Sequence, residues 1–121
     1  MATITAAIDR NTVPGVILVT WDAMTTGDVG GGIPIAFAAD LTGQVTGTFG
    51  GGTITWQGSN DNTNWHPMTQ RGGTGNMAFT AAAVHTANEN PAFIRPVVTG
   101  GSSVVIKCVA CVTARYAKTP Y

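Results

Sequence analysis

The chain has 121 residues, a formal net charge of +0 at pH 7 and only 10% charged residues. This balance excludes binding to nucleic acid or to an anionic membrane through a bulk electrostatic field. Hydrophobic residues make up 44% of the chain, which excludes a disordered protein. A small monomer with so little charge is prone to associate, so we expect neighbouring molecules to cover much of its surface.

The length is enough for one domain. We divide it into an N-terminal arm or edge strand (1–12), a β-sandwich domain (13–115) and a C-terminal tail (116–121). Residues 1–12 alternate weakly and end in polar residues, and this pattern is typical of an edge strand or of an arm that reaches a neighbour.

The segment from residue 13 to residue 49 predicts three strands. Residues 13–21 are almost continuously apolar β-formers, so both faces of this strand need cover. Residues 22–32 read as a glycine-rich loop, which lacks the lysine of a phosphate-binding loop. Residues 33–37 form a short strand that Pro34 assigns to a sheet edge or a strand start. Residues 42–49 alternate strictly between the two faces.

Residues 50–68 predict a β-hairpin with a polar tip. A four-residue loop over 60–63 would set Trp56 opposite Pro67. Trp65 would then share a face with Trp56, since directly opposed residues lie on one face of a sheet. We therefore predict that the two tryptophans together anchor the core.

The next segment combines a loop, a strand pattern and an alanine-rich stretch. Residues 70–76 form a loop, and residues 77–82 alternate as a strand does. The alanine-rich stretch 81–89 fits a single helical turn as well as a strand. Residues 88–91 form a turn that ends at a proline.

Two strands end the predicted domain. In the strand 92–98, Ile94 and Val98 point inward and Arg95 points outward. The last strand has one unbroken apolar face, made of Val104, Ile106, Cys108, Ala110, Val112 and Ala114. Cys108 and Cys111 therefore lie on opposite faces, beyond the reach of a disulfide. In total, about eight short strands predict an all-β fold, an antiparallel sandwich or barrel.

Catalytic groups are few in this sequence. Ser59, Asp61 and His66 fall within eight residues on one hairpin, which does not aim them at a shared substrate atom. His66 and His85 are the only histidines, and the six acids are scattered without a carboxylate pair. We predict that the protein is not an enzyme and that it needs no cofactor and no metal.

Binding sites for small ligands have two candidates. The loop residues Asn60, Asp61, Asn62 and Asn64 could hold a ligand, although an Asx-rich turn is favoured over a calcium loop because carboxylates are missing. Trp21, Trp56 and Trp65 could line a sugar-binding groove, although burial in the core is favoured for them. The basic residues do not cluster, which argues against a nucleic-acid partner.

Three segments together resemble the head decoration, or cement, proteins of tailed bacteriophages. They are TGQVTGTF at 42–49, GGTITWQGSNDNTNW at 51–65 and FIRPVVTGG at 93–101. The resemblance implies a jelly-roll-like β-sandwich, assembly as homodimers or homotrimers, and no catalysis. Asn62 stands where a glycine is common in the turn, and this substitution is expected to change the geometry of the turn but not the class of protein.

From these observations we expect a virion protein that decorates and stabilises the outside of a phage capsid. Its partners would be the major capsid protein and copies of itself, without nucleic acid or membrane. The expected contact residues are Ile4, Ile8, Arg10 and Val13, and deletion of residues 1–12 should abolish capsid occupancy while leaving the sandwich folded. No signal peptide is visible, so synthesis in the host cytoplasm is expected. The alternative is a carbohydrate- or receptor-binding module of a phage tail or fibre.

Overall fold

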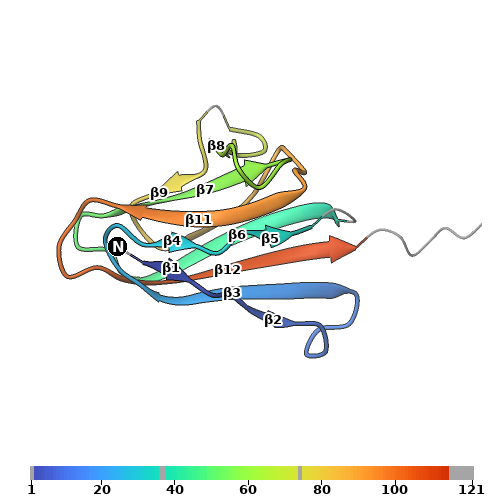
Figure 1. The fold of residues 1–121 in the computed structure, drawn as a ribbon, viewed down its shortest axis with the longest axis horizontal. Coiled ribbons are helices and arrows are strands. Elements are labelled where there is room, and N and C mark those ends of the chain that lie inside the picture. The colour runs from blue at the N-terminus through green and yellow to red at the C-terminus, as the bar shows by residue number, and fades with distance from the viewer. Residues whose placement is uncertain (1, 36–37, 74, 115–121) are drawn as a thin grey trace, which may run out of the picture.

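Two β-sheets face each other in the computed structural model, which describes residues 2–35, 38–73 and 75–114 (Figure 1). These residues form twelve strands, and none of them belongs to a helix that could cross a membrane. The bounds are β1 Thr3–Ile4, β2 Ala7–Asp9, β3 Val16–Met24, β4 Val29–Gly30, β5 Ile33–Pro34, β6 Ala38–Thr48, β7 Thr53–Ser59, β8 His66–Pro67, β9 Ala78–Phe79, β10 Ala83–Thr86, β11 Phe93–Thr99 and β12 Val105–Ala114.

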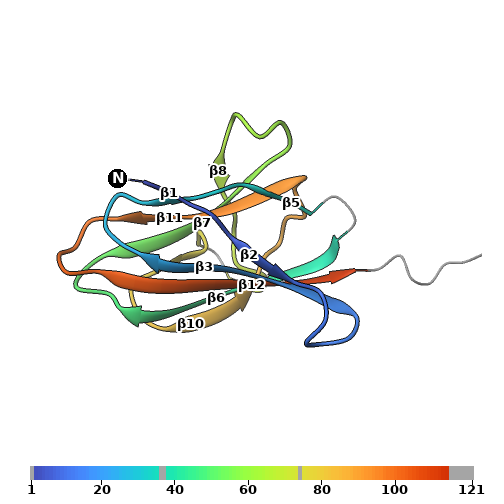
Figure 2. The same cartoon turned by 60° about the horizontal axis from the view of Figure 1, so that its bottom comes forward.

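The seven-stranded sheet has the order β1-β4-β11-β7-β8, with β5 also paired to β11 and β9 also paired to β7. The five-stranded sheet has the order β10-β6-β12-β3-β2, which can be followed in Figure 2. All strand pairs are antiparallel except β1 with β4. The predicted all-β fold with two packed sheets is confirmed, while the jelly-roll connection stays a prediction.

The alternation of the last two long strands is confirmed. Ile94 and Val98 of β11 are fully buried, and Arg95 between them lies on the outer face. Val104 and the even-numbered residues of β12 up to Val112 are buried, whereas the side chain of Ala114 lies outside the described residues. Cys108 is buried, Cys111 is half-buried, and both are free thiols. Burial raises the pKa of the Cys108 thiol to about 12, so this cysteine behaves as a core residue.

Several strand boundaries differ from the predictions. β3 continues to Met24 and β4 lies inside the predicted loop 22–32. β6 begins at Ala38, four residues before the predicted start, and residues 36–37 of the predicted edge strand lie outside the described residues. The stretch 81–89 contains strand β10 and no helical turn. β10 pairs with β6 over four residues, and this pairing outweighs the weak helix preference of alanine.

The hairpin register was predicted wrongly by one residue. Gln57 opposes Pro67 and Gly58 opposes His66, so Trp56 does not oppose Pro67. A shift of one residue moves every side chain of the return strand to the other face. Trp56 is fully buried, whereas Trp65 lies half-buried on the outer face of the seven-stranded sheet and does not share the core.

The tryptophan that pairs with Trp56 in the core is Trp21, from the opposite sheet. The two indole rings meet edge to face, with centroids 5.7 Å apart and planes at 72°. Each ring lies against a glycine of the facing sheet. A Cβ added to Gly43 would lie 2.7 Å from Cε2 of Trp56, and one added to Gly30 would lie 2.9 Å from Cδ1 of Trp21. The two glycines thus make the space in which the two largest core side chains interlock.

The first residues of the chain take part in both sheets. β1 adds to the seven-stranded sheet beside β4, and β2 adds to the edge of the five-stranded sheet beside β3. The backbone N–H of Ala2 donates to Oδ1 of the buried Asp28 at 3.0 Å, and the N–H and hydroxyl of Thr25 donate to Oδ2. The segment from residue 2 to residue 9 is therefore integrated into the sandwich.

The interlock predicts the effect of a methyl group at Gly43. In the Gly43→Ala variant the added Cβ overlaps the indole of Trp56, so the free energy of unfolding in urea should fall by about 1–3 kcal/mol. Gly75→Ala is the matched control, because a Cβ at Gly75 meets nothing within 4 Å. Equal stability of the two variants would contradict the packing described here.

The Asp28 carboxylate predicts a pH-dependent contribution to stability. The N–H of Thr25 is the largest cause that lowers its pKa, followed on the same side by the Thr25 hydroxyl and the N–H of Ala2, while burial opposes them. The pKa of Asp28 is lower in the folded state than in the unfolded chain, where it is about 3.9. Its stabilisation is therefore fully present at pH values above the unfolded pKa, and it is lost as the pH falls through the folded pKa.

We therefore expect Asp28→Asn to lower the free energy of unfolding by about 1.5–3 kcal/mol at pH 7, since hydrogen bonds to a charged group are lost. The difference from the parent protein should shrink as the pH falls below about 4. The control is Asp22→Asn, since exposed Asp22 accepts a hydrogen bond from a single described residue, through the adjacent N–H of Ala23. A deficit that does not change with pH would contradict the assignment.

Candidate functional site

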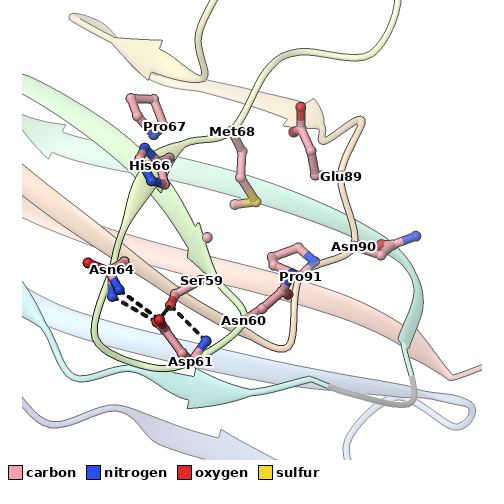
Figure 3. A pocket seen from close by; sticks show the side chains of 11 residues that line it. Ser59, Asn60, Asp61, Asn64, His66, Pro67, Met68, Glu89, Asn90 and Pro91 are labelled. Atoms are coloured by element: carbon pink, nitrogen blue, oxygen red, sulfur yellow. Dashed lines mark hydrogen bonds between the residues drawn. The ribbon is translucent and has the colours of Figure 1, made fainter.

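A cleft of about 500 Å³ lies at the end of β7, beside the hairpin loop (Figure 3). This volume is in the range, about 300–1,000 Å³, of pockets that bind small molecules. The lining residues come from the hairpin and from the segment before β11, and they are Gly58, Ser59, Asn60, Asp61, Asn64, His66, Pro67, Met68, Glu89, Asn90 and Pro91.

Strand pairing brings the two walls of the cleft together. β11 pairs with β7 so that Phe93 opposes Ser59, which places residues 89–91 beside the loop. The amide oxygen Oδ1 of Asn60 accepts a hydrogen bond from the N–H of Ala92 at 3.0 Å. Gly58 lets the wall approach closely, because a Cβ there would lie 2.6 Å from Cγ of Pro91.

The Asp61 carboxylate holds the loop in shape. Its Oδ1 accepts hydrogen bonds from the N–H groups of Thr63 and Asn64 and from the Ser59 hydroxyl, and its Oδ2 accepts one from Nδ2 of Asn64. These bonds, led by the N–H of Asn64, hold the pKa of Asp61 well below its usual range. Asp61 therefore shapes the loop and is not a free ligand group.

Asn62 adopts φ +59°, in the left-handed region that glycine favours. This residue stands where the resemblance expects a glycine, and asparagine is one of the residues that tolerate this conformation. Asn62 therefore takes up the same left-handed conformation that a glycine would favour, and the turn does not have to change to accommodate it. Its side chain does not line the cleft but lies near Gly32, where an added Cβ would be 2.8 Å from Oδ1 of Asn62.

The structure does not link Ser59, Asp61 and His66 into a hydrogen-bonded triad. The buried Ser59 hydroxyl donates to Asp61 and accepts from the N–H groups of Asp61 and Asn62, so it caps the turn. His66 is exposed and forms no hydrogen bond with Ser59 or Asp61. The described part of the chain contains no group of three or more His, Cys, Asp or Glu that could hold a metal ion.

The carboxylate of Glu89, on the opposite wall of the cleft, accepts two hydrogen bonds from Thr69. Its Oε1 accepts from the N–H of Thr69 at 2.8 Å, and its Oε2 accepts from the Thr69 hydroxyl at 2.6 Å. Burial acts to raise the pKa of Glu89, but these hydrogen bonds outweigh it and the pKa is lowered. Glu89 is thus ionised at neutral pH and lacks the raised pKa of a general acid. The second histidine, His85, lies elsewhere and stacks on Phe79 with ring centroids 5.1 Å apart.

The expected contact residues of the N-terminal segment lie in different environments. Ile4 is half-buried and packs against the core. Ile8 and Val13 are each 43% exposed, and Arg10 is also exposed. Ile8 and Arg10 additionally line a small pocket of about 50 Å³ at the β2 edge. Three of the four residues are thus accessible to a partner, and Ile4 contributes mainly to packing.

A further cluster was not predicted from the sequence. On the outer face of the seven-stranded sheet, Cζ of Arg95 lies 4.3 Å from the centroid of the Trp65 ring, at the distance of a cation–π contact. Nε of Arg95 donates to Oε1 of Gln57 at 2.9 Å. The outward direction of Arg95 was predictable, but the partner was not, because the hairpin register assigned Trp65 to the core.

Comparison with known proteins bears on the fold alone. No protein-family model matches the chain, and no curated protein matches it. Among solved structures, the SPBc2 prophage-derived protein YomS is similar with a TM-score of 0.62, over 86% of this chain and 100% of that chain. The sequences are 11% identical, so the two proteins share an architecture.

The loop geometry predicts the effect of removing the Asp61 carboxylate. In Asp61→Ala the N–H groups of Thr63 and Asn64 lose their acceptor, so their amide hydrogen exchange should become faster than in the parent protein. Asp40→Ala removes the same charge from an exposed surface ion pair with Arg71 and should leave these two amides unchanged. Unchanged exchange in Asp61→Ala would show that Asp61 does not shape the loop.

Proposed function

We propose that this chain is a structural protein of a bacteriophage particle, which binds the outside of the capsid as a homo-oligomer and stabilises the shell. Two observations support the phage assignment. The architecture is similar to that of a prophage-derived protein, and the segments 42–49, 51–65 and 93–101 resemble head decoration proteins. Under this proposal the partners are the major capsid protein and copies of the chain itself, and the role requires neither a catalytic group nor a cofactor.

The observation that carries the proposal is the outer face of the five-stranded sheet, here called the Thr/Val face. One lysine is the only charge among its central residues, which are Thr42, Gln44, Thr46 and Thr48 of β6, Val105, Lys107 and Val109 of β12, and Val84 of β10. Val84 is 59% exposed and Val105 is 52% exposed. Protein interfaces are depleted of charge at their centre and tolerate such apolar groups, so this face suits contact between subunits.

The edge of the same sheet adds to this surface. Ile8 lies in edge strand β2 and Val13 lies in the turn before β3, and both are exposed. Because residues 2–9 are bonded into both sheets, deletion of residues 1–12 would remove two strands as well as a contact surface. Substitution of Ile8, Arg10 or Val13 with a polar residue is the cleaner test of an N-terminal capsid contact.

A second candidate function rests on the cleft beside the hairpin loop. Its lining combines apolar side chains, such as Met68 and Pro91, with polar ones, a combination that suits a neutral sugar or a peptide. This arrangement favours a carbohydrate- or receptor-binding module of a tail or fibre. Saturable shifts of the backbone amides of residues 60–64 on titration with host glycans would favour this function over capsid decoration.

The Thr/Val face predicts the oligomeric state of two variants. A lysine at Val105 or at Val84 introduces a second charge among the central residues of the face, so we expect Val105→Lys and Val84→Lys to shift the protein towards monomer in sedimentation velocity. Thr99→Lys, on an exposed position of the seven-stranded sheet, is the control and should not change the mass. Parent protein and all three variants sedimenting as the same species would contradict self-association through this face.

The capsid role is tested with particles of the phage that encodes this chain, made with and without its gene. Particles without the chain should release DNA at a lower temperature, and addition of the purified chain should restore the parent temperature. Particles that never contain the chain, or whose thermal release of DNA is the same with and without it, would contradict the proposal. Loss of adsorption to the host instead would favour the tail or fibre function.

A further inference from the structure

The guanidinium of Arg95 is fixed by two contacts but forms no salt bridge with a described residue. The stack on Trp65 fixes one side of the guanidinium, and the bond from Nε to Gln57 fixes its rotation. Neither terminal nitrogen forms a hydrogen bond with a described residue. Arg95 is half-buried, and this loss of solvent lowers the pKa of its guanidinium, although arginine stays charged in proteins.

None of the six acidic side chains pairs with Arg95. Asp9, Asp28, Asp61 and Glu89 accept hydrogen bonds from nearby backbone and hydroxyl groups, Asp22 accepts from the N–H of Ala23, and Asp40 pairs with Arg71. The pair of Arg71 with Asp40 is the salt bridge formed within the described ranges. No carboxylate of the described residues therefore pairs with Arg95, and its charge is left for a partner.

The surroundings of Arg95 are typical of the centre of a protein interface. Phe93 and Val97 flank it on β11, and both are half-buried on the outer face of the sheet. Gly32 makes room for the indole of Trp65, since a Cβ on Gly32 would lie 3.0 Å from Cη2 of that ring. We call Gln57, Trp65, Phe93, Arg95 and Val97 the Arg95 patch.

Tryptophan and arginine, together with tyrosine, are enriched among interface hot spots, where surrounding contacts of little energy of their own exclude water. We propose that the Arg95 patch is a protein-docking surface, at which Arg95 receives a carboxylate from an acidic side chain of a different protein. The two free terminal nitrogens offer a planar pair of donors, which matches the two oxygens of a carboxylate. A nucleic-acid backbone fits less well, because it needs several clustered cations and the described residues of this face present one, Arg95.

This inference deepens the proposed function. It rests on that proposal for the identity of the partner, which is the capsid shell. It gives the two sheets separate tasks. The neutral Thr/Val face suits contact between copies of the chain, whereas the Arg95 patch suits a partner that supplies negative charge. The hairpin loop matters to the patch because its register directs Trp65 to the outer face.

The test uses particles that lack this chain, to which the purified full-length protein is added and bound protein is measured after pelleting. We expect Arg95→Gln to weaken binding by about ten-fold or more, because the acidic partner is left buried and unpaired. Arg95→Lys should restore only part of the binding, since lysine lacks the planar pair of donors. Arg71→Gln, which removes the same charge from an exposed surface pair, is the matched control and should bind as the parent protein does.

Binding of Arg95→Gln at the parent level would overturn the docking inference while leaving the capsid role intact. Absence of binding by the parent protein would instead remove the capsid role. In that case a second measurement decides the docking inference. Titration with sodium acetate should shift the ¹⁵N-labelled Arg95 Nε–H and Trp65 Nε1–H saturably, sodium chloride should not, and Arg95→Gln should abolish the response of Trp65.

Acetate without a saturable effect would overturn the carboxylate site. Glucuronate that binds far more tightly than acetate would overturn the choice of a protein partner, since an acidic sugar would then be the better occupant. Circular dichroism melting of each variant checks that it is folded before binding is compared. Arg95 lies on the outer face of its sheet, so all of these variants are expected to fold.

Discussion

The sandwich depends on the interlock of two tryptophans with two glycines across its two sheets. Trp21 extends from the five-stranded sheet against Gly30, and Trp56 extends from the seven-stranded sheet against Gly43. A side chain on either glycine would collide with the indole, so the distance between the sheets is set by these contacts. Because these contacts close the core, the outer faces of the two sheets contribute little to it. The two outer faces differ in chemistry, since one is the Thr/Val face and the other carries the Arg95 patch.

Alternation of apolar residues was sufficient to predict the long strands that have a neighbouring strand on each side, such as β11 and β12. The buried face of β12 and the outward direction of Arg95 on β11 follow from a period of two. Short strands were harder, because β1, β4, β5, β8 and β9 have only two residues each and carry no period of their own. Their pairing depends on tertiary neighbours, as does β10, where the pairing with β6 decides between strand and helix.

The candidate site depended on a hairpin register that composition alone does not determine. Hydrogen bonds from Thr63 and Asn64 to Asp61, together with the left-handed backbone of Asn62, fit one more residue into the loop than was predicted. That residue turns Trp65 outward to Arg95. The predicted loop residues Asn60, Asp61 and Asn64 do line a cleft, but its opposite wall comes from residues about thirty positions away in the sequence, which no local pattern indicates.

Cryo-electron microscopy of the phage particles that carry this chain tests the central claim most directly. We expect density for the sandwich at regular positions on the outside of the head, in contacts between copies through the five-stranded sheet and with the capsid protein through the seven-stranded sheet. Density found only at the tail or at a fibre tip would contradict the account, and it would make the cleft beside the hairpin loop the functional surface.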